Sequence, residues 1–78
     1  MITIIPKGCK QPDLKQMQTL VDGRIERHPE RVVIDNSSYD VIVNEEGLIN
    51  NLPINEQMFE DYGLTIFGNA ILLEGGLR

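Results

Sequence analysis

The sequence predicts an α+β protein, with a small, mostly antiparallel sheet of four to five strands packed against one longer and one short helix. Short runs rich in β-branched residues alternate with turn-forming residues along most of the chain. Two other segments carry helix-capping residues before apolar residues at helical spacing. The length of 78 residues allows a single domain, residues 1–78, for which we expect a thin two-layer core.

The first part of the chain predicts one strand and then the longer helix. The β-branched run Ile2–Ile5 is followed by a proline, which cannot donate a ladder hydrogen bond. Asp13 stands three residues before Gln16, the spacing of a capping box, and the apolar residues that follow fall on one helical face. We therefore expect a helix over Leu14–Asp22, ended by Gly23 in a left-handed conformation.

Three strand-like segments follow the helix. Arg24–Arg27 alternates polar and apolar residues as a half-buried strand does, and Arg31–Ile34 is a second short strand candidate. Residues 35–38, Asp-Asn-Ser-Ser, have the composition of a loop. Tyr39–Val43 then predicts a central strand whose odd-numbered residues share one face of the sheet.

The segment Val43–Gln57, VNEEGLINNLPINEQ, predicts a hairpin turn followed by a helix cap. Asn44–Gly47 fits a type I turn in which Gly47 takes the positive φ. The two apolar residues after the glycine would begin the return strand. Turn and cap chemistry thus accounts for both the acidic and the amide residues of this segment.

The last part of the chain predicts the short helix and a closing strand. Asn55 is a favourable N-cap for a helix over Glu56–Tyr62, and Gly63 supplies its stop. The apolar residues expected to face the core are Ile54 or Met58, together with Phe59 and Tyr62. Leu64–Leu73 reads as one broken strand or two short ones, with a bulge or turn at residues 68–69.

Composition limits the classes of function. The chain has twelve acidic and seven basic residues, which gives a formal net charge of -5. Such a chain repels phosphate backbones, so we expect no direct nucleic-acid binding. The lone cysteine, Cys9, and the absence of a signal peptide predict a reducing cytoplasm. The apolar runs are too short to cross a bilayer, so we expect no membrane partner.

No residue pattern predicts catalysis, a cofactor or a metal site. The single histidine and the single cysteine carry no local motif, and the carboxylates fall mostly on turns and helix starts. The glycines have neither Walker nor dinucleotide spacing. We therefore expect a protein that is not an enzyme and holds no cofactor.

Four segments carry a family resemblance. They are LVDGRIE at Leu20–Glu26, VIVNEEG at Val41–Gly47, NLPIN at Asn51–Asn55 and IFGNAILL at Ile66–Leu73. Taken in this order, they resemble a domain-of-unknown-function family of small proteins from bacteriophages and mobile genetic elements. The chain differs from that family at Asp22, where a second glycine is common, and over residues 29–38.

The resemblance implies a phage or mobile-element accessory protein in the cytoplasm of a bacterial host cell, with no catalytic residues to carry over. Our first hypothesis is that it binds and inhibits a host protein, such as a defence protein. An acidic surface would dock on a basic, nucleic-acid-binding face of that partner. The candidate contacts are Glu45, Glu46, Glu56, Glu60 and Asp61.

The alternative is an oligomeric sponge that sequesters a nucleotide signal of host immunity between subunits. In that case the candidate ligand contacts are Arg24, Arg27, Arg31, Lys7 and Lys10 for the phosphates, with Tyr39 or an asparagine such as Asn55 on the base. A third hypothesis is a regulatory subunit of phage replication or morphogenesis. Besides these partners, the sequence allows a homodimer.

Overall fold

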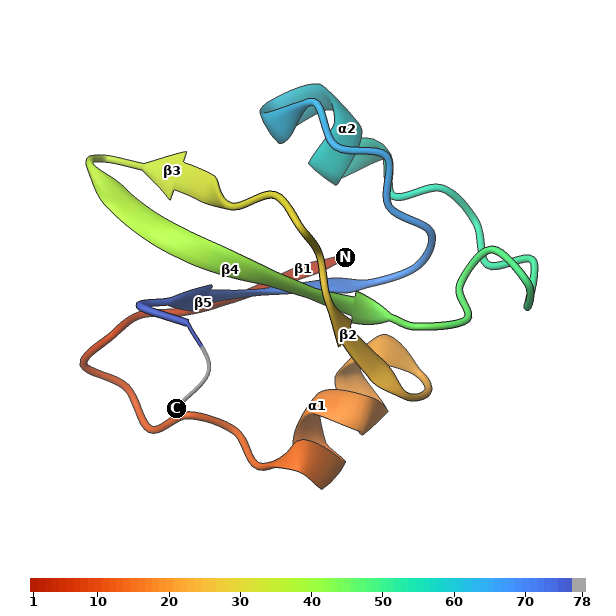
Figure 1. Cartoon of the computed structure of the whole chain (residues 1–78), viewed down its shortest axis with the longest axis horizontal. Helices are drawn as coiled ribbons and strands as arrows, with labels where there is room; N and C mark the ends of the chain where they lie inside the picture. Colours follow the sequence, from red (N-terminus) through yellow and green to blue (C-terminus); the bar gives the residue numbers. More distant parts are fainter. Residues whose placement is uncertain (77–78) are drawn as a thin grey trace.

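The computed structural model describes residues 1–76 as one sheet with two helices (Figure 1). The elements run β1 (Ile2–Ile5), α1 (Leu14–Val21), β2 (Ile25–Arg27), β3 (Val32–Ile34), β4 (Ser37–Asn44), α2 (Glu56–Tyr62) and β5 (Ala70–Glu74). The predicted α+β class is confirmed, with helices of eight and seven residues. None of the described helices has the length and apolar character needed to cross a membrane.

The sheet is organised around β4, its longest strand. The strand order is β1-β5-β4-β2, and β3 also pairs with β4. β2 and β3 follow one another along the same side of β4, since Arg27 lies opposite Ile42 and Val32 opposite Tyr39. The pairings with β4 are antiparallel, whereas β1 runs parallel to β5, so the sheet is mixed but mostly antiparallel.

The two helices cover opposite faces of the sheet, so the fold has three layers instead of the expected two. Met17 of α1 shares a buried cluster with Ile42, while Met58 of α2 shares another with Val41. Successive residues of a strand point to opposite faces, and this alternation supplies both clusters from the same strands. In Figure 1, α1 lies below the sheet and α2 above it.

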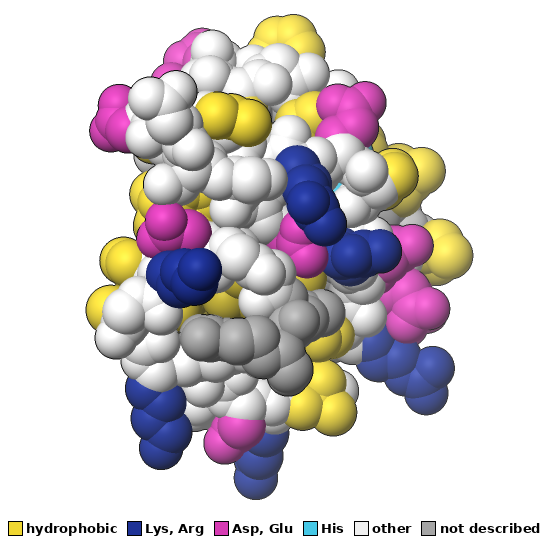
Figure 2. All heavy atoms as spheres, turned by 60° about the vertical axis from the view of Figure 1, so that its left-hand side comes forward, with side chains coloured by type: hydrophobic (Ala, Val, Ile, Leu, Met, Phe, Trp, Pro, Cys, Tyr) yellow, Lys and Arg dark blue, Asp and Glu magenta, His cyan; other side chains and the backbone are white. Residues whose placement is uncertain are grey.

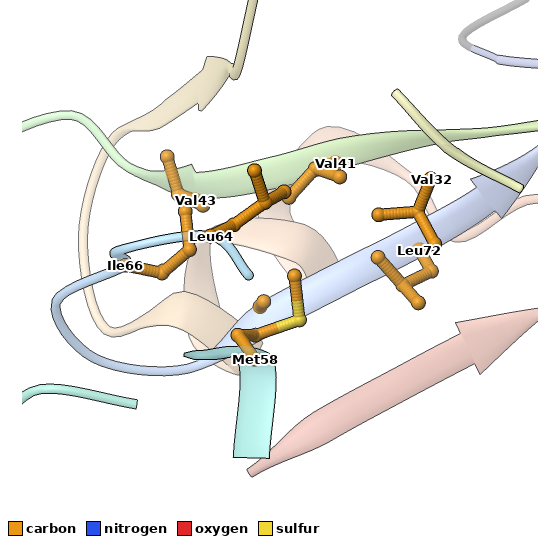
Figure 3. Close-up of a cluster of buried hydrophobic side chains, with 8 residues drawn as sticks. Val32, Val41, Val43, Met58, Leu64, Ile66 and Leu72 are labelled. Carbon is orange, nitrogen blue, oxygen red and sulfur yellow. The ribbon is translucent and has the colours of Figure 1, made fainter. Parts of the chain in front are cut away.

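The cluster under α2 is the larger of the two (Figure 3). Its labelled members are Val32, Val41, Val43, Met58, Leu64, Ile66 and Leu72, and Tyr62 packs against it, as expected. Leu64 and Ile66 come from the irregular segment between α2 and β5. That segment therefore holds α2 on the sheet as well as connecting it.

Helix α1 begins as predicted and ends one residue early. The Asp13 side chain accepts from the Gln16 N–H, and the Gln16 side chain accepts from the Asp13 N–H, both at 2.8 Å. The capping box is therefore confirmed. The left-handed stop is Asp22, with φ 63, so the prediction that Gly23 takes this role is wrong. Aspartate is one of the few residues that adopts this conformation at low cost.

Helix α2 is confirmed over its predicted range. The Asn55 side chain accepts from the Met58 N–H at 3.0 Å, and Gly63 ends the helix with φ 70. Of the alternatives Ile54 and Met58, Met58 faces the core and is fully buried, while Ile54 is 46% exposed. Phe59 is 55% exposed, so the expectation that it faces the core is wrong. A helix of about two turns presents few side chains to a sheet, and Met58 takes the central position.

The loop between β3 and β4 is shorter than predicted. Only Asp35 and Asn36 turn the chain, with φ of 49° and 67°. Ser37 already pairs with Ile34, so β4 begins two residues before the expected Tyr39. Positive φ at both central residues is the signature of the tight hairpin turn that matches strand twist, and Asp and Asn tolerate it.

A turn is present at Asn44–Gly47, where the Gly47 N–H donates to the Asn44 carbonyl at 3.2 Å. It continues as a helical turn over residues 45–51, so the predicted hairpin and return strand are wrong. The Asn51 N–H donates to the Leu48 carbonyl at 3.2 Å, and the Leu52 N–H donates to the Gly47 carbonyl at 3.0 Å. Asn51 has φ 55, and these features together form a Schellman motif. The positive φ expected at Gly47 therefore occurs at Asn51 instead.

The chain after α2 breaks where the sequence predicts. Phe67 forms an isolated antiparallel bridge with Ile54, and Gly68 then turns the chain with φ 93. Strand β5 starts at Ala70 and crosses the centre of the sheet. This path places residues 64–67 beside the segment that leads into α2, next to the 45–51 turn.

Candidate functional site

Asn44 fixes the place from which the 45–51 turn projects. Its Nδ2 donates to the carbonyls of Val21 and Asp22, each at 3.0 Å, and its Oδ1 accepts from the Glu46 N–H at 2.7 Å. The side chain is buried between the end of α1 and the turn. One amide thus links the helix, the end of β4 and the acidic turn.

Two further asparagines serve as tertiary links. Asn55 Nδ2 donates to the carbonyls of Met1 and Gly68, at 3.2 and 2.9 Å, in addition to capping α2. Asn69 Nδ2 donates to the Leu20 carbonyl at 3.0 Å. Asn55, named from sequence as a candidate ligand contact, is therefore buried and hydrogen bonded within the fold.

The five candidate partner contacts are exposed and fall into two groups. Glu45 and Glu46 lie on the 45–51 turn, whereas Glu56, Glu60 and Asp61 lie on α2. No salt bridge within residues 1–76 involves any of these carboxylates. Figure 1 shows the turn beyond the end of β4 and α2 above the sheet. All five carboxylates are therefore exposed, on two separate elements of the fold.

Exposed apolar side chains accompany both acidic groups. Leu48 and Ile49, on the 45–51 turn, are 68% and 76% exposed. Phe59 is exposed on α2, between the carboxylates of that helix. Single exposed apolar residues are ordinary on a protein surface, but two adjacent ones beside two glutamates form a surface suited to protein contact.

Charge is segregated along the chain and in space. Residues 32–76 hold eight carboxylates and no Lys, Arg or His, while residues 1–31 hold six Lys or Arg residues and four carboxylates. On the face shown in Figure 2, Lys and Arg side chains lie over the middle and lower parts. The upper part, at the height of α2, carries carboxylates and apolar side chains. On this face carboxylates also lie among the Lys and Arg side chains of the middle and lower parts, so the part at the height of α2 differs from them by its lack of Lys and Arg.

A hollow of about 200 Å³ adjoins the acidic turn. Its lining includes the polar side chains Glu26, His28 and Glu45 and the apolar side chains Val43, Leu48, Ile66 and Phe67. The Glu30 N–H donates to His28 Nδ1 at 3.1 Å, which holds the ring against its own backbone. A lining that combines carboxylates with apolar side chains suits the charged head and the apolar stem of a basic side chain.

The arginines named for a nucleotide ligand are only partly brought together. Arg31 Nε lies 3.0 Å from Asp40 Oδ1, and Arg27 Nη1 lies 3.7 Å from Asp40 Oδ2. Asp40 is buried, so both exposed guanidinium groups share one internal carboxylate. Arg24 lies at the other end of β2, where its carbonyl accepts from the Glu45 N–H. Tyr39 points to the face opposite Asp40.

Tyr39 and Glu74 lie opposite each other on β4 and β5. Partial burial raises the pKa of Tyr39, and the nearby Glu74 carboxylate adds to this shift. The Lys7 N–H, which donates to Glu74 Oε1 at 2.9 Å, lowers the pKa of Glu74, and a hydrogen bond from the Ser37 side chain contributes. Glu74 thereby ties the segment after β1 to the end of β5.

We expect the Glu74 hydrogen bonds to make stability depend on pH in acid. Because the folded pKa of Glu74 is lowered, its contribution is present above the ordinary value of 4.5. That contribution is lost as the pH falls from there through the folded pKa. Unfolding by denaturant at a series of pH values should show a smaller acid loss for Glu74→Gln than for the wild type. Equal pH profiles would contradict this role.

Sequence reasoning missed the hollow beside the turn. Glu26 lies on β2 and His28 directly follows that strand, and a spacing of two residues in extended chain puts both side chains on one face, which is a signal in the sequence. Their approach to residues 65–67 depends on the tertiary path after α2, which no local pattern reveals. Within residues 1–76, no group of three or more His, Cys, Asp or Glu side chains is arranged to hold a metal ion.

Comparison with known proteins gives one match. A model of the family described as "Domain of unknown function (DUF3846)" matches residues 2–76. Neither the search of curated proteins nor the search of solved structures returned a match. The family match covers nearly the whole chain, from β1 to the residues just after β5. This chain therefore belongs to the DUF3846 family, a family of domains of unknown function.

Proposed function

We propose that this domain binds another protein through the exposed carboxylates of the 45–51 turn and α2, without catalysis. The observation that carries the proposal is the segregation of charge. The described chain from β3 onward exposes carboxylates on the 45–51 turn and on α2, and it has no basic residue to neutralise them. An acidic surface of this kind attracts a partner with a basic surface and accelerates their encounter.

The exposed apolar residues make a protein a better partner than a free cation. Leu48 and Ile49 stand next to Glu45 and Glu46 in the sequence and are among the most exposed apolar side chains of the described protein. Burying them against a partner removes apolar surface from water, while the glutamates select basic residues around the contact. The 45–51 turn is therefore the centre of the proposed surface.

The hollow beside the turn offers a place for one basic side chain of the partner. Glu26 and Glu45 stand at its lining, and Val43, Ile66 and Phe67 supply apolar contacts. An arginine or lysine inserted there would lay its methylene groups on the apolar residues and its charge near the carboxylates.

The proposed partner is a protein of the bacterial host, and the proposed effect is inhibition. Resemblance to small phage and mobile-element proteins supports this assignment, since such accessory proteins act on host machinery, including defence proteins. A partner with a basic face commonly uses that face to hold nucleic acid. Covering it with an acidic domain would block the partner without any chemical reaction.

Capture from bacterial lysate tests the proposal. Immobilised wild-type domain should retain a protein with a basic surface, and retention should weaken as salt is raised, because screening reduces charge attraction. The double variant Glu45→Lys/Glu46→Lys should lose most of that retention. Both side chains are exposed and outside salt bridges within residues 1–76, so the fold should tolerate the change.

Two outcomes would contradict the proposal. One is the double variant retaining the same protein as strongly as the wild type. The other is native mass spectrometry showing an oligomer that carries a nucleotide-sized adduct, which would support the sponge hypothesis instead. The adduct experiment would then be repeated with Arg27→Ala, because Arg27 belongs to the arginine set of that hypothesis and is exposed.

A further inference from the structure

The two edges of the sheet differ in how they resist pairing with another strand. At one edge, β2 contains two charged residues and β3 follows one directly. Pro29 lies between these two strands. β1, at the other edge, is Ile-Thr-Ile-Ile, with no charge and no internal proline. Charges and prolines are the usual protection of an edge strand. β1 therefore has the unprotected edge of this sheet.

Half of the backbone groups of β1 face away from the sheet. β1 pairs with β5 alone among the described strands. The Met1 carbonyl accepts from the Ala70 N–H, so in a parallel ladder the odd residues Met1, Thr3 and Ile5 face β5. The N–H and C=O groups of Ile2 and Ile4 then point outward. Two residues thus offer four backbone groups to a further strand.

We propose that a second copy of this chain pairs with β1 in antiparallel fashion, about a twofold axis at Thr3. In that register Ile2 of one protomer lies opposite Ile4 of its partner, and each such pair exchanges both of its backbone hydrogen bonds. The outward groups of β1 therefore match themselves under a twofold axis. Such an interface is self-complementary, as a closed dimer requires.

Side chains and charge favour a second copy over a foreign strand. Ile4 is 47% exposed on the face covered by α2, and the partner's Ile2 would be its cross-strand neighbour. Two copies of an uncharged strand bring no like charges together, although each chain has a net charge of -5. The interface lies on β1, whereas the proposed protein-binding turn follows β4, so this inference does not depend on the proposed function.

Mass measurement in solution tests the dimer. The contact is small, so the dimer should form with rising concentration, and light scattering or sedimentation should follow it from about 10 μM to about 1 mM. Ile4→Lys places a charge on the edge and should remain monomeric over that range. Val33→Lys, the same kind of change at an exposed position of β3, should dimerise like the wild type.

A second variant and a second measurement distinguish loss of the dimer from loss of the fold. Ile4→Pro removes an outward N–H and leaves the bonds to β5, so it should also be a folded monomer. Hydrogen exchange of the wild type should show the Ile2 and Ile4 amides exchanging fast when dilute and more slowly when concentrated. The Thr3 amide should be protected at both concentrations.

Three results would overturn the second-copy proposal. The first is a monomeric wild type at the highest concentration, with fast exchange at Ile2 and Ile4. The second is a dimer that survives in both Ile4→Lys and Ile4→Pro, which would place the interface elsewhere. The third is protection of Ile2 and Ile4 only when a captured partner protein is added, which would assign the edge to that partner.

Discussion

Replacing Asn44 with aspartate is expected to lower the free energy of unfolding by about 3 kcal/mol at neutral pH. Asn44 Nδ2 donates to the carbonyls of Val21 and Asp22, and both of these bonds are lost in Asn44→Asp. The new carboxylate oxygen would face two carbonyl oxygens in a buried position. The bond that Oδ1 accepts from the Glu46 N–H is retained, so the variant isolates the link to α1.

Denaturant unfolding of matched variants measures this effect. Asn50→Asp makes the same chemical change on the exposed part of the 45–51 turn and should stay within about 0.5 kcal/mol of the wild type. Asn44→Ala should also destabilise, because it leaves the same two carbonyls and the Glu46 N–H without this side chain. Equal stabilities for Asn44→Asp and Asn50→Asp would show that the link between α1 and the turn is unimportant.

Gly47→Ala is expected to lower the free energy of unfolding by about 2 kcal/mol. A Cβ at Gly47 would lie 2.6 Å from the carbonyl oxygen of Phe67 and 3.3 Å from its Cβ. Backbone cannot rotate away as a flexible side chain does, so either the turn or residues 65–67 must move. Since Gly47 lies outside the positive-φ region, the cost arises from this close contact and not from the backbone conformation.

Gly8→Ala is the matched control for Gly47→Ala. Gly8 is exposed, and a Cβ there meets nothing within 4 Å. Its melting temperature should equal that of the wild type or exceed it slightly, because alanine reduces the freedom of the unfolded chain. A Gly47→Ala protein as stable as Gly8→Ala would show that the contact between the turn and Phe67 is loose.

The features set by neighbouring residues could be predicted from the sequence. The capping box of Asp13 and Gln16, and the α2 helix between Asn55 and Gly63, depend on contacts within four residues. The alternation of β4 similarly records which residues face each side of the sheet. These elements follow from local hydrogen bonding and periodicity, which the amino-acid order shows directly.

The turns were harder to predict from the sequence. At two of them aspartate or asparagine takes the conformation expected of glycine, and at a third no turn type was predicted. Asp22, Asn36 and Asn51 all adopt positive φ in this fold. Glycine was the expected residue at two of these turns, since it adopts that conformation most readily. Gly47 is needed for a different reason, its closeness to Phe67, and that reason is invisible until residues 65–67 are placed.

The sequence predicted which kinds of residue the candidate site contains, but not how they are arranged in space. The acidic residues of the 45–51 turn and α2 are exposed, as a binding surface requires, but they form two groups. The hollow lined by Glu26, His28 and Glu45 depends on segments about 20 to 40 residues apart, which packing alone brings together. The number of layers was predicted wrongly for a similar reason. The alternation along a strand shows that both faces of the sheet are apolar, but it does not show which helix covers each face.

One comparison tests the central claim, that the acidic turn binds a basic protein, most directly. Glu46→Lys and Glu30→Lys change the net charge by the same amount, but Glu46 lies on the 45–51 turn and Glu30 lies beyond the far end of β2. The amount of captured protein should fall at least tenfold for Glu46→Lys, a loss of about 1.4 kcal/mol, and stay near the wild-type level for Glu30→Lys. Equal losses in the two variants would contradict the claim, because they would show that only the net charge of the domain matters.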